Sequence, residues 1–120
     1  MGIRDQLIVI IQSEMGRTPW YNEMGGKDHW SVGSWMAMGR GIQGNRVIGG
    51  TEIHPETGVD QSPTLIDPIH LQASATGIKI KPQHIHAALR DLVGISQHEY
   101  AQRFPLNVPD HEVLAGLWGT

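Results

Sequence analysis

The feature that most limits what this chain can fold into is a short apolar run at residues 7–11, Leu-Ile-Val-Ile-Ile. Its hydrophobicity is continuous rather than alternating, which is typical of a strand that is buried on both faces of a sheet. The run is much shorter than the roughly 20 residues that a membrane-spanning helix needs. A chain of 120 residues has room for one modest core. The sequence therefore predicts a single α/β domain over residues 1–120, with residues 7–11 as a central strand.

Charged side chains follow the predicted strand at once. Glu14 and Arg17 come first, and Asp28 and His29 follow a predicted loop over residues 14–26. In open α/β sheets, ligands bind beyond the carboxyl ends of the strands. A carboxylate and an imidazole suit Zn or Mn, and a guanidinium suits the oxygens of phosphate or sulfate. Together they are what metal-assisted ester hydrolysis requires. The structural alternative is a Glu14–Arg17 ion pair with Asp28 as a helix cap.

Two motifs in this region resemble the signature of a bacterial family, the domain of unknown function 1501. They are Ser-Glu-Met-Gly-Arg-Thr-Pro at residues 13–19 and Gly-Gly-Lys-Asp-His-Trp at residues 25–30. The family usually has Phe where this chain has Met15. The resemblance continues through residues 39–44, 47–49, 80–82 and 92–95. This family is a sulfatase-like branch of the alkaline phosphatase superfamily.

The resemblance implies a fold and a set of roles. The fold is a partial alkaline-phosphatase-like sheet with a short hairpin and one or two packed helices, as a fragment of a larger fold. The function is that of a metal-dependent hydrolase acting on phosphate or sulfate esters, with Zn or Mn as the divalent metal. Glu14 and His29 would be metal ligands, Asp28 a ligand or a supporting residue, and Arg17 the anion-binding residue.

Members of the superfamily are several times longer than this chain. Their metal site also uses an Asp from the first strand, and their nucleophile is a Ser, Thr or modified Cys on the helix that follows. We therefore expect this chain to correspond to the C-terminal part of such a protein, with no catalytic residue of its own and incomplete as an enzyme. The family is similar to proteins that are exported with a twin-arginine signal, so the resemblance implies a periplasmic or exported location, although these residues contain no signal peptide.

The alternative function is a non-catalytic interaction or oligomerisation module. An apolar strand with free edges pairs readily with other chains, so we expect self-association or a partner chain that supplies the missing half. A net charge of −3 and a pI near 6.1 leave no basic surface for nucleic acid. Since the chain has no cysteine, disulfides and thiolate metal sites are excluded.

The remaining local patterns predict five further elements. Residues 31–38 are predicted as a second strand, Gly44-Asn45 as the turn of a hairpin, and residues 78–81 as a lysine-protected edge strand. An amphipathic helix is predicted over residues 82–93, because Pro opens it, apolar residues follow helical spacing, and Gly94 ends it. Asp67-Pro68 is predicted to start a turn.

Residues 96–120 form a predicted docking tail, in which Ser96 caps a second short helix through Glu99. The isolated histidines are predicted to be surface residues rather than metal ligands. His84 and His86 are two residues apart, so on a helix their side chains diverge and do not share a metal.

Overall fold

The computed structural model describes residues 2–54, 56 and 61–119. Contacts divide the chain into two compact units, residues 1–42 and residues 43–120. The fold is mixed α/β, with short antiparallel strand pairs and two α-helices, as the sequence predicts. The single domain of residues 1–120 stays a prediction, which a single cooperative unfolding transition would support. None of the described helices is long and apolar enough to cross a bilayer.

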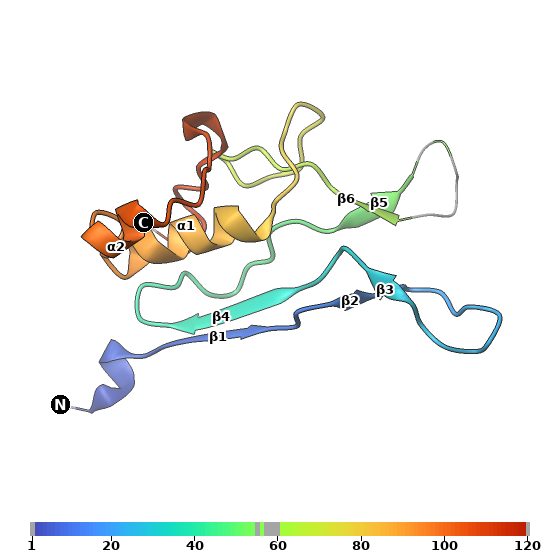
Figure 1. Ribbon diagram of the computed structural model, residues 1–120, viewed down its shortest axis with the longest axis horizontal. Coiled ribbons are helices and arrows are strands. Elements are labelled where there is room, and N and C mark those ends of the chain that lie inside the picture. The colour runs from blue at the N-terminus through green and yellow to red at the C-terminus, as the bar shows by residue number, and fades with distance from the viewer. Residues whose placement is uncertain (1, 55, 57–60, 120) are drawn as a thin grey trace. The chain divides into compact units, whose positions relative to one another are not determined.

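Unit 1 is built on a two-stranded ribbon. After a 3-10 turn, Ile3–Gln6, strand β1, Ile8–Gln12, pairs antiparallel with β4, Trp35–Gly39 (Figure 1). Both strands were predicted, within a few residues of these bounds. The central, fully buried position predicted for residues 7–11 is wrong. In the described residues β1 pairs with β4 alone, so one edge of β1 has no neighbouring strand, and Ile11 is 53% exposed.

The register of the ribbon places apolar side chains on both of its faces. Val9 lies opposite Met38 and Ile11 lies opposite Met36, so these four side chains share one face. We call this the Met36/Met38 face. Both methionines and Ile11 are exposed there. A strand pair that is apolar on both faces is the pattern expected of sheet that another layer covers.

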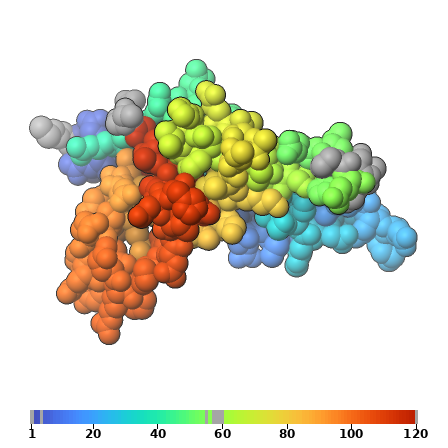
Figure 2. Space-filling model, turned by 90° about the horizontal axis from the view of Figure 1, so that it is seen from above, coloured from blue at the N-terminus to red at the C-terminus, as the bar shows by residue number. Residues whose placement is uncertain are grey.

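Unit 2 contains the buried apolar residues of the described chain. Strands β5, Thr51–Ile53, and β6, Gln61–Pro63, form a short antiparallel pair. Ile66 makes isolated bridges to Ala73 and to Ile78. Ile66, Ala88 and Leu114 are the buried hydrophobic residues, at 2%, 8% and 1% exposure. The predicted docking tail thus supplies Leu114, and Figure 2 shows the red C-terminal segment against orange and yellow segments of the same unit.

The predicted helix is confirmed as α1, Pro82–Leu92. Pro82 stands in its first turn, and Gly94, with a φ of 73°, follows its end. A second helix, α2, Glu99–Arg103, is also present. Its predicted cap is wrong, since the capping side chain belongs to His98, which accepts from the main-chain N–H of Tyr100. A helix that begins at Glu99 leaves Ser96 too far upstream to cap it. A 3-10 turn, Asp110–Glu112, follows in the tail.

The hairpin turn predicted at Gly44-Asn45 is wrong. Residues 42–48 contain no strand, and Asn45 has a φ of 57°. Arg46 instead donates two hydrogen bonds, at 2.7 and 2.6 Å, to the carbonyls of Gly116 and Leu117 in the tail. This long-range anchor competes with local strand pairing. The edge strand predicted at residues 78–81 is reduced to the bridge at Ile78.

Candidate functional site

The predicted site residues lie on and around a small antiparallel pair in unit 1. Strand β2, Gly16–Arg17, pairs with β3, His29–Trp30, so that Arg17 lies opposite His29. A short strand thus interrupts the loop predicted over residues 14–26. Gly16 is required there, since a Cβ at this position would lie 1.8 Å from the carbonyl oxygen of Val32. The structure brings Arg17 and His29 onto one face of the pair, and both are exposed.

The loop between these strands, residues 18–28, is closed at its base by Thr18. The main-chain N–H of Thr18 donates to the carbonyl of Asp28 at 3.1 Å, and the N–H of Asp28 donates to Oγ1 of Thr18 at 3.2 Å. The Thr18 hydroxyl in turn donates to the carbonyl of Trp20 at 2.9 Å. Thr18 is only 6% exposed. Its buried hydroxyl both donates and accepts a hydrogen bond, as buried polar groups usually do. Its hydroxyl is therefore occupied in holding the loop.

Asn22 organises the interior of the same loop. Its Oδ1 accepts from the main-chain N–H groups of Met24 and Gly26, and its Nδ2 donates to Oδ1 of Asp28 at 2.8 Å. Asp28 therefore supports the loop and caps no helix. The helix-capping role that the sequence offered as an alternative for Asp28 is wrong. The sequence reasoning missed Asn22. An Asn shortly before a Gly-Gly pair is a turn signal that points to this role.

The cations at the site have weak, neutral partners. Nη1 of Arg17 lies 3.5 Å from the carbonyl oxygen of Lys27. Nζ of Lys27 lies 3.4 Å from the carbonyl oxygen of Pro19 and 4.8 Å from the ring centroid of Tyr21. The ion pairs among the described residues all involve histidines of unit 2. The Glu14–Arg17 ion pair considered as the structural alternative is therefore absent among the described residues. Lys27 is a second cation beside Arg17, and the sequence reasoning did not single it out.

The predicted metal ligands do not form a closed group. Glu14 and Asp28 are both exposed, and the carboxylate of Asp28 is bonded to Asn22. Over the described part of the chain, no three His, Asp or Glu side chains lie close enough to hold a metal ion. A catalytic zinc site normally has three protein ligands. Glu14, Asp28 and His29 do not meet that requirement by themselves, and metal binding stays a prediction.

His84 is not the surface residue that the sequence predicts. It is 1% exposed, its Nδ1 accepts from the main-chain N–H of Lys81 at 3.0 Å, and its Nε2 lies 2.9 Å from Oε2 of Glu112. An acceptor at Nδ1 assigns the proton to Nε2, which donates to Glu112. His84 precedes the buried Ala88 by one helical turn. That spacing was the signal that places it on the inner face of α1.

Asp67 begins the predicted turn, and its carboxyl group has a lowered pKa. Its Oδ1 accepts from the main-chain N–H groups of His70 at 2.7 Å and Ile69 at 2.9 Å. The hydrogen bond from His70, more than any other contact, holds the pKa of the Asp67 carboxyl below its ordinary value. His70 itself is exposed and its Nδ1 lies 3.1 Å from Asp67. The turn at Asp67-Pro68 is thus confirmed.

Comparisons with known proteins complete the description of the site. No curated protein and no solved structure matches the chain. A sequence model of a family described as "Protein of unknown function (DUF1501)" matches residues 1–102, a range that includes Glu14, Arg17, Asp28 and His29. The membership that the two motifs predict is confirmed: this chain belongs to the DUF1501 family.

Proposed function

We propose that this chain carries the anion-binding part of a metal-dependent hydrolase that acts on phosphate or sulfate esters, in the sulfatase-like branch of the alkaline phosphatase superfamily. The observation that carries the proposal is the pairing of Arg17 with His29 across β2 and β3. Residues directly opposite in an antiparallel pair have Cβ atoms about 4.5–5.5 Å apart. Two such side chains are able to reach one tetrahedral oxyanion from the same face.

The chemistry of Arg17 fits this role. A guanidinium donates two parallel N–H groups to a phosphate or sulfate. Its present contact, at 3.5 Å to a carbonyl, is at the outer limit of a hydrogen bond, so the side chain loses little when it turns to an anion. Lys27 adds positive charge on the adjacent loop. Positive groups placed beside a transferring phosphoryl or sulfuryl group stabilise the charge of the transition state.

The same chemistry argues against turnover by this chain alone. An ester hydrolase of this kind needs an activated nucleophile. Thr18 is the buried hydroxyl beside the site, but it already donates to Trp20 and accepts from Asp28. We therefore expect anion binding without esterase activity. Zn or Mn is expected to bind weakly through His29, with Glu14 and Asp28 as further candidate ligands.

The anion proposal is tested with inorganic phosphate and sulfate as probes, by NMR titration at low salt. We expect saturable shifts at residues 16–18 and 27–30, weaker at higher ionic strength because the charges are exposed. Arg17→Ala should abolish them and Arg17→Lys should restore only part. Arg103→Ala, at an exposed arginine on α2, is the matched control. Equal binding by the parent and by Arg17→Ala would overturn the proposal.

The metal proposal is tested separately, by titration calorimetry with Zn or Mn. Binding by the parent that is lost in His29→Ala would support it. His111→Ala removes a histidine whose side chain is 80% exposed and serves as the control. If parent and His29→Ala bind equally, the metal site involves other residues. If neither binds, the chain is not a metal-site fragment by itself.

A second function, an interaction module, is favoured by the Met36/Met38 face. An exposed patch of apolar side chains on a strand pair with free edges is typical of an association surface. Light scattering over a range of concentrations should reveal self-association. The double change Met36→Lys and Met38→Lys should reduce it, while Val47→Lys, at a residue 92% exposed in unit 2, should not. A parent chain that stays monomeric at high concentration would exclude self-association.

A further inference from the structure

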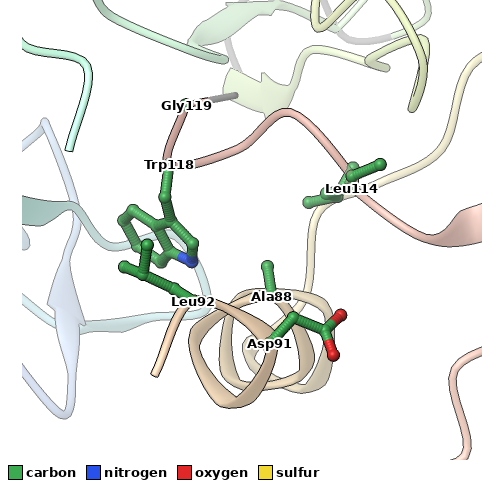
Figure 3. A pocket seen from close by; sticks show the side chains of 7 residues that line it. Ala88, Asp91, Leu92, Leu114, Trp118 and Gly119 are labelled. Carbon is green, nitrogen blue, oxygen red and sulfur yellow. The ribbon is translucent and has the colours of Figure 1, made fainter. Parts of the chain in front are cut away.

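The two units differ in the hydrogen-bonding groups that a partner can reach. In unit 2 a hollow of about 210 Å³ lies between α1 and the tail (Figure 3). The indole nitrogen of Trp118 belongs to its wall but is buried, so a molecule in the hollow does not reach it. In unit 1, by contrast, β1 pairs with β4 alone among the described residues. Its other edge carries main-chain N–H and C=O groups that no neighbouring strand there uses.

The phase of the β1–β4 hydrogen bonds identifies the main-chain groups on this free edge. The N–H of Arg40 donates to the carbonyl of Leu7 at 3.1 Å. In the register of the two strands, hydrogen-bonded pairs therefore recur at Val9 and Ile11. The residues of β1 that alternate with these pairs point their N–H and C=O groups away from β4. These outward residues are Ile8, Ile10 and Gln12.

The sequence of β1 contains none of the features that usually block a strand edge. Proteins protect an edge strand with Lys, with Pro or with a β-bulge. Strand β1, Ile-Val-Ile-Ile-Gln, has no Lys, no Pro and no charge, and its register with β4 runs without a break. A two-stranded pair is only marginally stable in water, whereas three or more strands with an apolar face form a stable sheet. The free edge of β1 is therefore suited to accept a further strand.

The strand is complementary to a second copy of itself. When two copies run antiparallel with Ile10 opposite Ile10, Ile8 of one copy lies opposite Gln12 of the other. All the outward main-chain groups of both copies then form hydrogen-bonded pairs. In the same register Val9 lies opposite Ile11 of the second copy, so apolar side chains meet across the pair. Because the strand is uncharged, no like charges oppose each other.

We propose that a second copy of this chain pairs with the free edge of β1, antiparallel and about a two-fold axis at Ile10. The strands then form one sheet in the order β4-β1-β1-β4, and the two Met36/Met38 faces join into one apolar surface. The pairing rests on the interaction module proposed above, and it specifies the partner, the strand and the register. It is independent of anion binding at Arg17.

Single cysteines test the register, because the chain has no cysteine of its own. In the proposed pair, residues 9 and 11 of the two copies are non-hydrogen-bonded neighbours, with Cα atoms about 4.5 Å apart. This distance lies within the range of about 4.4–6.8 Å that disulfides span. Identical residues are instead diagonal neighbours, about 7–8 Å apart. Under mild oxidation, a mixture of Val9→Cys and Ile11→Cys should form a disulfide-linked dimer, and each variant alone should form little. Val9→Cys mixed with Val47→Cys, at an exposed residue of unit 2, is the control for random collision.

Proline variants test the edge itself. Ile10→Pro removes an N–H that points away from β4, so the β1–β4 pair should remain. The dissociation constant of the dimer, measured by light scattering, should rise about tenfold or more, because the central pair loses its hydrogen bonds. Ile11→Pro removes a donor to β4 instead and should disrupt the ribbon. NMR cross-strand contacts between β1 and β4 report which of the two effects has occurred.

The outcomes separate this pairing from self-association in general. A disulfide formed by the mixture, together with weaker association of Ile10→Pro, supports the proposal. Equal cross-linking by either variant alone, or by the Val47→Cys control, overturns it. If Ile10→Pro associates as tightly as the parent, the free edge is not the interface, and the interaction module through the Met36/Met38 face survives. A strictly monomeric parent overturns both. If Ile10→Pro loses the ribbon, the cysteine mixture carries the test.

Discussion

The two units differ in what they bury. In unit 2 the buried apolar residues Ile66, Ala88 and Leu114 come from segments that are distant in sequence. In unit 1 the buried residue among those described is Thr18, a polar side chain held by hydrogen bonds. Apolar burial contributes roughly 25 cal/mol per Å², whereas a typical hydrogen bond contributes only about 1 kcal/mol net. Unit 2 therefore has a small apolar core. Unit 1 is a strand ribbon with a loop that hydrogen bonds hold in place.

This difference bears on function. A hydrogen-bonded loop with exposed cations is suited to binding a ligand, because less ordering is then required when the ligand binds. The ribbon that carries it leaves the Met36/Met38 face exposed. Such a unit gains stability when a further layer covers that face. Four changes test whether the two units are as different as their burial suggests.

The largest effect is expected for Leu114→Ala in unit 2. Leu114 is 1% exposed, so truncation leaves a cavity and should lower the free energy of unfolding by about 2–5 kcal/mol. Leu89→Ala, on the half-buried part of α1, should cost less. Urea denaturation followed by circular dichroism measures both. A loss at Leu89 equal to that at Leu114 would show that the helix buries a different face.

A smaller loss is expected for His84→Ala. The change leaves the N–H of Lys81 without its acceptor and Glu112 without its donor, at a cost of about 1–3 kcal/mol. Glu112→Gln keeps an oxygen that accepts from Nε2 of His84 and should be milder. The same urea measurement compares them. If His84→Ala is neutral, the buried histidine does not join α1 to the tail as its hydrogen bonds indicate.

Thr18→Val should have a local effect of about 1 kcal/mol in unit 1. The isosteric change removes the acceptor of the Asp28 N–H and the donor to Trp20. Hydrogen exchange at the amides of residues 18–28 should become faster, while exchange in α1 stays unchanged. Thr18→Ser keeps the hydroxyl and is the control. Faster exchange in both units would mean that they unfold together, which would break the comparison.

The smallest effect concerns acid and the Asp67 turn. Because hydrogen bonds lower the folded-state pKa of Asp67, its contribution to stability is present above the unfolded pKa of about 3.9 and is lost as pH falls through the lower folded value. NMR titration of the Asp67 carboxyl should give a midpoint below that of a free Asp. Asp67→Asn should remove this step. A midpoint at or above the ordinary value would contradict the hydrogen bonds.

Elements that depend on neighbouring residues were predicted well. Pro82, the helical spacing of the apolar residues and Gly94 all act within one or two turns, and α1 was found within one residue of its expected end. The strand at residues 7–11 was likewise found as β1, since β-branched residues favour extended backbone. The family motifs are also contiguous, and membership in DUF1501 was recognisable from them.

The candidate site was predicted in its residues but not in its arrangement. Arg17 and His29 were named from their chemistry, while their pairing across β2 and β3 depends on the register of the two strands. Neither Asn22 nor Lys27 was identified. The turn signal at Asn22 was overlooked, and the partners of Lys27 lie six and eight residues away in the folded loop. Glu14 was grouped with His29 because both follow the predicted strand and from the family resemblance, and their joint binding of a metal stays a prediction.

What the sequence determined by itself is the main strand, the main helix and the family. What only the tertiary structure decided is which side chains are buried and which meet. His84 looks like any histidine near a helix start, and its burial depends on Glu112, 28 residues away. Arg46 looks like a hairpin residue, and its partners lie 70 and 71 residues away. Local patterns report contacts within a few residues, whereas burial and pairing are set by segments that meet only in the folded chain.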